Sequence, residues 1–455
     1  MGVDRCLLNQ AKAGYEASFA PGLPMLIPIS RRQVLAGTAL AVTCLNLPTR
    51  AQSPNVAADG FRVLRARPGT AVLHGEGRPP TPIWGYDGTA PGPVLRVKRG
   101  EELRVRLVNE LPEPTAVHWH GVRLPNAMDG VPLLTQEPVA PGASYEYRFR
   151  PPDAGTFWYR PAGNATKQAG RGLRGALIVE ETAPVAVDRD VLMVFEDWYL
   201  PDSRIALPGG GHLTVNGAPA FELLARPNER LRLRLLNAAV RRMLTLRLER
   251  HAPLVMAIDG QPAEPFPARD SRVMLGPGNR VDLLVDLTLS AGERAPILVE
   301  DGGGGGPIAS VTYAGEPARA APLPEPRPLP PNPLPERLDL RNASRHDLPL
   351  DAFAPLAAPL HQRPPLFTVR RGRTVVLAFV NRAEFPLCVH VHGYHFRLLD
   401  RLDDGWKPYW LDTLTLPARQ TDRVAFIADN PGKWLIETQP FASAHAGAAA
   451  WFGVT

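Results

Sequence analysis

Hydrophobic and polar residues alternate along three similar stretches of the chain, most regularly in the first two. The stretches are Leu103–Asn109, Leu231–Asn237 and Val375–Asn381, and their closing asparagines are 128 and 144 residues apart. Side chains two residues apart point to the same face of a strand, so each stretch is expected to be a strand with an apolar face. We therefore expect three copies of one module. A shorter apolar segment follows each stretch, at 145–149, 281–285 and 424–426.

Proline and glycine place turns between these strands. The 455 residues include 51 prolines and 40 glycines, and proline at about twice its usual frequency disfavours long helices. Short strands joined by turns favour an all-β fold of consecutive β-sandwiches or barrels. We expect the modules at residues 55–183, 188–314 and 337–455. Residues 315–336 are rich in proline and are expected to form a stiff, extended linker.

The N-terminal residues resemble an export signal. Arg31 and Arg32 precede a 14-residue apolar run at 34–47, and small residues follow near Ala51. This order resembles a twin-arginine signal peptide, and the run is shorter than the roughly 20 residues that a membrane span requires. We therefore expect residues 1–51 to be a leader, the mature protein to have no membrane span, and its location to be the periplasm.

The charge distribution argues against nucleic-acid binding, and the cysteine content argues against a disulfide-stabilised fold. The formal net charge is +6, but only five of the 51 basic residues are lysines and the arginines are scattered along the expected strands. This distribution argues against nucleic-acid binding. Two of the three cysteines lie in the leader, which leaves Cys388 alone and excludes an intramolecular disulfide in the mature chain.

Two histidine pairs are the candidate metal ligands. His118 and His120 flank Trp119 and precede a glycine, and His390 and His392 flank Val391 in the same way. On a strand the two imidazoles of each pair project to one face, where they can meet at one place. Imidazole nitrogen suits copper and zinc. Because two such pairs lie in equivalent modules, metal binding is favoured over satisfied polar patches at strand ends.

Together with neighbouring motifs, these pairs resemble the multicopper oxidases. The resemblance covers roughly residues 60–455 and implies three consecutive cupredoxin-like Greek-key β-barrels. It also implies a type 1 copper in the third domain and a three-copper cluster between the first and third domains. The further motifs that carry it are Asp129-Gly130-Val131-Pro132, Thr135-Gln136, Gly155-Thr156-Phe157-Trp158-Tyr159, Phe396 and Pro431-Gly432-Lys433-Trp434.

The resemblance assigns the four histidines to separate coppers. His118 and His390 correspond to the type 2 ligands, and His120 and His392 each correspond to one ligand of a separate type 3 copper. Two further family motifs are replaced. A His-x-His motif is replaced by Arg160 to Ala162, and a His-Cys-His motif is replaced by Glu437, Thr438 and Gln439.

The type 1 centre of the family has no counterpart in this sequence. Thr438 stands at the position of its cysteine, Leu387 at that of one histidine, and His445 is two residues out of register with the other. No methionine follows Met274 to serve as an axial ligand. Blue copper chemistry depends on a cysteine thiolate. We therefore expect no conventional laccase activity.

Two interpretations of the histidines remain open. In the first, the four hold one copper or one zinc, fewer ions than the family's four, with Glu437 as an additional oxygen ligand. In the second they are a structural remnant in a copper-free scaffold. Such a scaffold would resemble the copper-free cell-division member of the family in the periplasm. The resemblance implies that the positions of Arg160 and Glu437 converge, and their opposite charges therefore predict an ion pair between the first and third domains.

The role of Cys388 and the partners of the protein also have alternatives. Cys388 alternates with His390 and His392, so it is either a further ligand or a small buried hydrophobic residue. Under the metal interpretation the partner is a small-molecule or metal-ion substrate. Under the scaffold interpretation it is a protein of the cell envelope.

Overall fold

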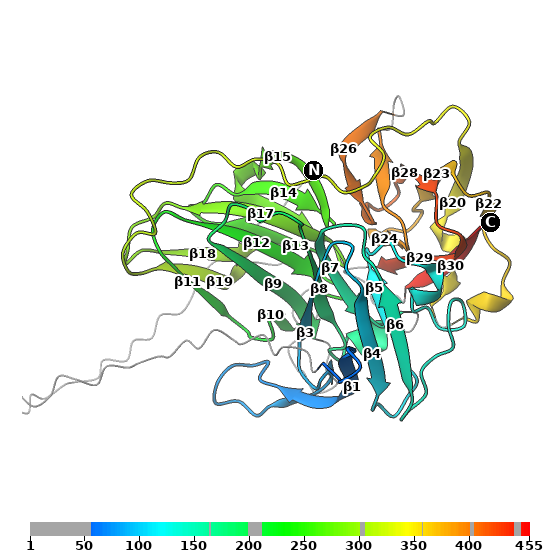
Figure 1. Ribbon diagram of the computed structural model, residues 1–455, viewed down its shortest axis with the longest axis horizontal. Coiled ribbons are helices and arrows are strands. Elements are labelled where there is room, and N and C mark those ends of the chain that lie inside the picture. Colours follow the sequence, from blue (N-terminus) through cyan, green and yellow to red (C-terminus); the bar gives the residue numbers. More distant parts are fainter. Residues whose placement is uncertain are drawn as a thin grey trace, which may run out of the picture. The chain divides into compact units, whose positions relative to one another are not determined.

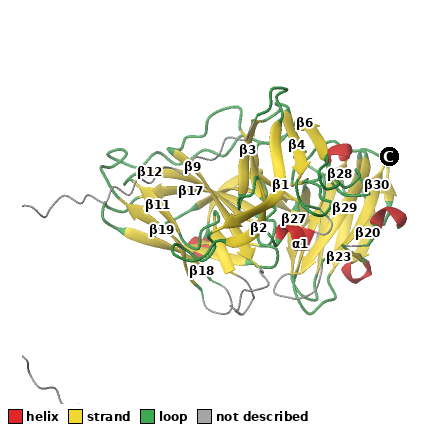
Figure 2. Cartoon of the chain, turned by 90° about the horizontal axis from the view of Figure 1, so that it is seen from below, coloured by secondary structure: helices red, strands yellow, loops and turns green. Residues whose placement is uncertain are grey.

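Strands make up nearly all of the regular structure (Figure 2). The computed structural model describes residues 56–162, 165–198, 212–300, 305–356, 358–400, 405–440 and 447–455. The expected leader lies outside these ranges, as does His445. Among the described residues, no helix is both long enough and apolar enough to cross a lipid bilayer.

The first domain packs two sheets against each other. Within its described residues the strand orders are β2-β1-β4-β6 and β3-β8-β7-β5. Two short helices, η1 (Asn126–Met128) and α1 (Ala165–Ala169), lie in its connections. The strands are β1 (Arg62–Ala71), β2 (Thr81–Tyr86), β3 (Gly92–Lys98), β4 (Leu103–Asn109), β5 (His118–His120), β6 (Ser144–Phe149), β7 (Gly155–Arg160) and β8 (Gly175–Glu180).

The second domain repeats this plan with longer sheets. Its described strands have the orders β10-β9-β12-β17-β14-β15 and β11-β19-β18-β13-β16, and its one described helix is η2 (Arg269–Ser271). The strands are β9 (Arg189–Trp198), β10 (His212–Val215), β11 (Phe221–Ala225), β12 (Glu229–Asn237), β13 (Leu244–Leu248), β14 (Leu254–Ile258), β15 (Gln261–Pro267), β16 (Arg272–Leu275), β17 (Arg280–Leu287), β18 (Arg294–Val299) and β19 (Gly306–Tyr313).

The third domain has the orders β20-β23-β28-β25-β26 and β21-β30-β29-β24-β27 in its described part, with β22 beside β30 (Figure 1). Its short helices are η3 (Leu350–Ala352) and η4 (Leu360–Gln362). The strands are β20 (Ser344–Pro349), β21 (Ala354–Pro355), β22 (Thr368–Val369), β23 (Arg373–Val380), β24 (Leu387–Val391), β25 (Phe396–Leu399), β26 (Trp406–Leu411), β27 (Thr413–Leu416), β28 (Thr421–Ala428), β29 (Gly432–Pro440) and β30 (Ala448–Val454).

The three repeated stretches occupy the same place in each domain. They form β4, β12 and β23, and each pairs in parallel with the first strand of its domain. Each also pairs antiparallel with the strand that contains the following apolar segment, β6, β17 or β28. The expected repeat is therefore confirmed as a repeat of strand topology, and the fold is three cupredoxin-like domains.

The asparagine that closes each stretch ties down the same turn in all three domains. Asn109 donates through Nδ2 to the carbonyl oxygens of Glu113 and Val139 at 2.9 and 2.8 Å, and its Oδ1 accepts from the amide of Leu111 at 3.0 Å. Burial makes these bonds costly to lose. The matching partners are Arg242, Leu275 and Ala239 for Asn237, and Phe385, Pro417 and Ala383 for Asn381.

Replacing Asn237 with alanine is expected to lower the free energy of unfolding by about 2–4 kcal/mol, because two buried carbonyls and one amide lose their partner. The exposed Asn342 offers a matched control, whose replacement by alanine should change stability by about 0.5 kcal/mol or less. Chemical denaturation of both variants is the measurement. Equal effects at the two positions would contradict a structural role for the repeated asparagine.

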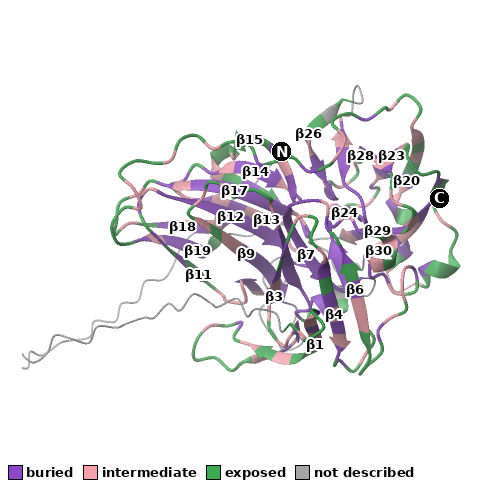
Figure 3. Ribbon diagram, viewed as in Figure 1, coloured by how far each residue is buried: buried purple, intermediate pink, exposed green. Residues whose placement is uncertain are grey.

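The hydrophobic core joins the first and third domains. One continuous cluster of buried side chains extends from β1 of the first domain to β30 of the third, whereas the second domain has a separate core. The nine residues of β12 are all buried (Figure 3). The expected linker packs against the domains. Leu329 is buried, and Asn332 donates to the carbonyl of Ala154 at 2.8 Å. The first and third domains therefore share an apolar interface that brings β5 and β24 together.

Candidate metal centre

Two strand pairs bring the four histidines together. In the first domain β5 pairs antiparallel with β7, with His118 opposite Arg160. In the third domain β24 pairs with β29, with His390 opposite Glu437. All four histidines have exposed fractions of 4 % or less. The resemblance implied this convergence, and the structure places the four side chains in one buried cluster at the interface.

The glycine after each His-x-His pair is required by its surroundings. Gly121 has φ +82°, and a Cβ there would lie 2.3 Å from Nη2 of Arg280. Gly393 has φ +71°, and a Cβ there would lie 2.1 Å from the ring of Trp434. A side chain at either position would meet both a strained backbone and a clash. The glycines therefore allow the chain to turn directly behind the histidines.

The imidazoles stack in two pairs. The rings of His118 and His392 have centroids 3.7 Å apart, and those of His120 and His390 have centroids 3.6 Å apart. Nε2 of His118 lies 3.3 Å from Nε2 of His390, across the domain interface. These two nitrogens thus face a common point from opposite domains.

A buried carboxylate from the first domain orients one histidine of each His-x-His motif. Asp129 accepts from Nδ1 of His118 at 3.1 Å through Oδ1, and from Nδ1 of His392 at 2.9 Å through Oδ2. An imidazole that donates from Nδ1 to a carboxylate points its Nε2 away from that carboxylate. Metal-binding histidines are commonly oriented in this way. The sequence contained Asp129 in a family motif but gave it no role.

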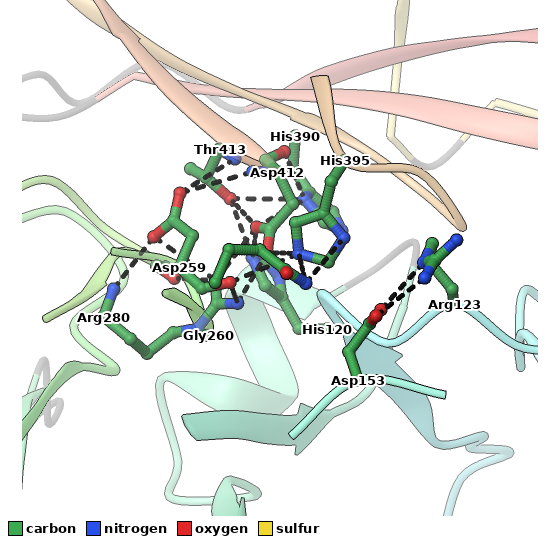
Figure 4. Close-up of polar contacts among 12 residues, drawn as sticks. His120, Arg123, Asp153, Asp259, Gly260, Arg280, His390, His395, Asp412 and Thr413 are labelled. Carbon is green, nitrogen blue, oxygen red and sulfur yellow. Dashed lines mark hydrogen bonds and ion pairs between the residues drawn. The ribbon is translucent and has the colours of Figure 1, made fainter. Parts of the chain in front are cut away.

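A second carboxylate, Asp412, holds the other two histidines (Figure 4). Its backbone oxygen accepts from Nδ1 of His390 at 2.9 Å, and its Oδ1 lies 3.3 Å from Nε2 of His120. The hydroxyl of Thr413 lies 2.9 Å from the same Nε2 of His120. The sequence analysis missed Asp412, since nothing in its local pattern marks it as a neighbour of histidines in another domain.

The protonation states differ within the cluster. Burial lowers the pKa of His118, and it lowers that of His390 to about 3, so both are neutral near pH 7. Burial also lowers the pKa of His392, but Asp129 and Glu437 outweigh burial and raise it to about 9. A metal ligand must release its proton. Metal binding at His392 would therefore displace a proton, whereas His118 and His390 are ready to bind.

The expected ion pair between Arg160 and Glu437 is present and buried. Nη2 of Arg160 donates to Oε2 of Glu437, with side-chain exposures of 6 % and 8 %. Oε1 of Glu437 lies 3.7 Å from Nε2 of His392. The guanidinium also lies 5.5 Å from the ring centroid of Trp158. The contact confirms the prediction and places a permanent cation beside the histidine cluster.

The donor set fits an imidazole-bound metal ion. Nδ1 of His120 and Nε2 of His392 are buried and have no hydrogen-bond partner among the described residues. Ligand atoms of His118, His390 and His392 all lie within 4.8 Å of one another. Imidazole nitrogens bind zinc at about 2.0–2.1 Å, and copper also prefers them. A small cavity of about 20 Å³ adjoins the cluster, with His120, His390 and Glu437 in its wall.

Three residues at positions where the resemblance implies family ligands make hydrogen bonds and apolar contacts. Thr438 donates from Oγ1 to the carbonyl of Ala448 at 3.1 Å, and Gln439 donates to that of Val240 at 2.5 Å. Ala162 packs in an apolar cluster between the first and third domains. Thr438 therefore stabilises the third domain itself, Gln439 its contact with the second domain, and Ala162 its contact with the first.

Cys388 is buried beside Leu387 in β24. Its Sγ lies 3.7 Å from Oγ1 of Thr415, and burial raises its pKa to about 12, so the thiol is protonated at neutral pH. In the described part of the chain, the groups that could hold a metal ion are His118-His390-His392 and His120-His390-Asp412. Cys388 belongs to neither, which favours its role as a small hydrophobic residue.

A second network that the sequence analysis missed supports the cluster from the second domain. Arg280 donates to Oδ1 and Oδ2 of Asp412 at 2.9 and 2.5 Å, and to the carbonyl of Asp259 at 2.9 Å. His395 lies 3.4 Å from the same Asp412 carboxylate. Burial and Asp412 raise the pKa of Asp259 to about 6.

Comparison with known proteins covers all three domains. Family models described as multicopper oxidase match residues 70–184, 189–293 and 330–455. The multicopper oxidase MmcO of Mycobacterium tuberculosis is 27% identical, over 89% of this chain and 91% of that protein.

Solved structures give the same result. The multi-copper oxidase of Pseudomonas thermotolerans is 33% identical with a TM-score of 0.76, over 86% of this chain and 98% of its own. Lac15 from a marine microbial metagenome is 33% identical with a TM-score of 0.75, over 86% of this chain and 99% of its own. The similarity therefore extends over nearly the whole length of these relatives.

Proposed function

This chain belongs to the multicopper oxidase family, and we propose that it is a periplasmic member that binds one copper ion and lacks a type 1 centre. His118, His390 and His392 would hold the ion. The observation that carries the proposal is the buried Arg160–Glu437 pair, which stands where the resemblance implies further histidine ligands. A bound copper would supply one-electron redox chemistry, so the activity would be that of an atypical copper-dependent oxidoreductase.

Charge is the reason to expect fewer ions than the family's four. Two unit charges of the same sign 4 Å apart repel by about 4 kcal/mol at an effective dielectric constant near 20. Glu437 neutralises the guanidinium of Arg160, but its Oε2 is then engaged with Arg160 and only Oε1 faces His392. Each additional copper ion would lie close to the guanidinium of Arg160. It would also find fewer imidazole ligands than in the family's cluster.

The residues around the histidines orient ligands and hold protons. Asp129 directs Nε2 of His118 and of His392 away from itself, and Asp412 does the same for His390 through its backbone oxygen. Glu437 lies beside Nε2 of His392, and Arg160 outweighs burial and keeps the pKa of Glu437 well below its usual value, so Glu437 stays a carboxylate that stabilises the protonated His392. The four imidazoles are also buried, so bulk solvent does not surround them.

A copper-free scaffold is the second candidate, with a protein of the cell envelope as its partner. The observation in its favour is that His118 and His390 are at hydrogen-bonding distance from each other, 3.3 Å between their Nε2 atoms. Both rings already donate from Nδ1, so the pair can satisfy itself without an ion only if one imidazole also carries a proton on Nε2 and donates it to the other. Metal content separates the two candidates.

Metal analysis of the protein from the periplasmic fraction, with an electron paramagnetic resonance spectrum, is the test. We expect about one copper per chain, bound by nitrogen ligands and without a blue absorption band. The double variant His118→Ala, His390→Ala should lose the copper, whereas His361→Ala, at an exposed histidine, should keep it. If the analysis finds zinc in place of copper, the metal in this proposal is wrong and the protein has no copper-dependent redox activity.

Three outcomes would contradict parts of this proposal. Absence of metal in correctly folded protein would favour the scaffold. About four coppers per chain with a blue band would mean that a complete family centre exists. Recovery of the mature protein only from the cytoplasmic fraction would overturn the periplasmic location.

A further inference from the structure

A groove lies where the second domain, the linker and the third domain meet. β15 lies beside β26 (Figure 1), and the groove between them has a volume of about 290 Å³. Its wall includes Ala263, Pro328, Pro331 and Pro408. Ligand pockets begin at about 300 Å³. The groove lies at the lower end of that range, which suits one small molecule with a single ring and nothing larger.

Arg397 lies in the wall of this groove and is unusual among the buried arginines. It is 9 % exposed, and its guanidinium carbon lies 4.7 Å from the ring centroid of Trp410. Nη1 donates to the carbonyl of Lys407 at 3.0 Å, but Nε is buried without a partner in the described residues. The other buried arginines with described partners have carboxylates: Arg160, Arg174, Arg230, Arg232, Arg234 and Arg280.

No carboxylate of the described residues forms an ion pair with Arg397. Burial lowers its pKa, and no acidic side chain contributes to the shift. A buried charge without a counter-ion is costly. Because the guanidinium is planar and lies over the ring of Trp410, its orientation toward a carboxylate in the groove is fixed in advance.

We propose that this groove binds a small aromatic monocarboxylate, with its carboxylate on Arg397 and its ring against the prolines. The proline rings offer flat apolar faces to an aromatic ring, and the groove has room for one. Glu264 and Glu336 are exposed in the same wall. These two carboxylates would repel a second negative charge on the ligand. The site is separate from the histidine cluster and does not depend on copper.

Isothermal titration calorimetry with benzoate tests the proposal on the mature protein. We expect one site per chain with a Kd of about 1 mM or tighter. Benzamide, which has the same shape without the charge, and terephthalate, which has a second carboxylate, should each bind at least about tenfold more weakly. Repeating the titration on the His118→Ala, His390→Ala variant excludes binding of the carboxylate to copper.

Two arginine variants locate the site. Arg397→Gln should weaken benzoate binding by about tenfold or more, and because it removes an unpaired buried charge it should not lower the melting temperature. Arg382→Gln is the matched control, since that exposed arginine pairs with Asp351 and should leave the affinity unchanged. The proposal fails if Arg397→Gln binds benzoate normally, if benzamide binds equally well, or if no heat of binding appears by about 10 mM benzoate.

Discussion

Replacing Arg280 with methionine is expected to lower the free energy of unfolding by about 4 kcal/mol or more. Arg280 is fully buried, with a relative exposure of 0 %, and its guanidinium connects all three domains. It donates from Nε to the carbonyl of Thr156 in the first domain at 3.0 Å, and from both Nη atoms to Asp412 in the third. Methionine would leave the buried carboxylate of Asp412 without its cation.

The electrostatic balance at Asp412 explains the size of this effect. Burial raises the pKa of Asp412, but Arg280 outweighs burial and keeps it well below its usual value. Without Arg280 the carboxylate must take up a proton or remain a buried, unpaired charge. Either change would disturb His120 and His390, which Asp412 holds.

Denaturation of the Arg280→Met protein by urea, without added metal, gives the measurement. The exposed pair Arg382–Asp351 supplies the comparison, because Arg382→Met should cost about 1 kcal/mol or less. Arg280→Lys, which keeps the charge but not the planar fork, should fall between the two. A loss below about 1.5 kcal/mol for Arg280→Met would mean that the interdomain pair contributes little.

Removing Glu437 alone is expected to destabilise the protein by about 3–5 kcal/mol. The guanidinium of Arg160 would then be buried beside a histidine cluster without its counter-ion. Replacing both residues, Arg160→Met with Glu437→Leu, should be close to neutral, because two apolar side chains of similar volume leave no buried charge. The pair thus predicts strong coupling between the two positions.

A double-mutant cycle on metal-free protein measures this coupling. The four proteins are wild type, Arg160→Met, Glu437→Leu and the double variant, and their unfolding free energies give the interaction energy. We expect about 3 kcal/mol of coupling or more. Additive effects would show that the contact does not stabilise the fold. Because the protein is metal-free, a change in copper binding cannot contribute to the measured unfolding free energies.

The sequence predicted those parts of the site that depend on strand periodicity. A His-x-His pair on a strand must present both imidazoles to one face, and the resemblance implied that the two pairs meet between the first and third domains. The resemblance also placed Arg160 and Glu437 at converging positions, where their opposite charges predicted the ion pair that the structure confirms. The repeated asparagines likewise indicated equivalent strands before their hydrogen bonds were known.

The carboxylates around the site could not be predicted in the same way. Asp129 and Asp412 reach their histidines from turns and strand ends, where no periodicity relates position in the sequence to direction in space. Arg280 and Arg397 are two of 51 basic residues, and only the packing of separate domains distinguishes them from solvated arginines. Contacts between domains depend on docking, which local patterns do not encode.

The shared core of the first and third domains has a consequence for synthesis. His118 and His390, whose rings meet in the folded protein, are 272 residues apart. A ribosome adding roughly 5–20 residues per second needs tens of seconds to cover that distance. During that interval the first domain presents an unfinished apolar face to water, where it is prone to aggregate or to recruit a chaperone. The four-histidine cluster can therefore form only after translation of the third domain.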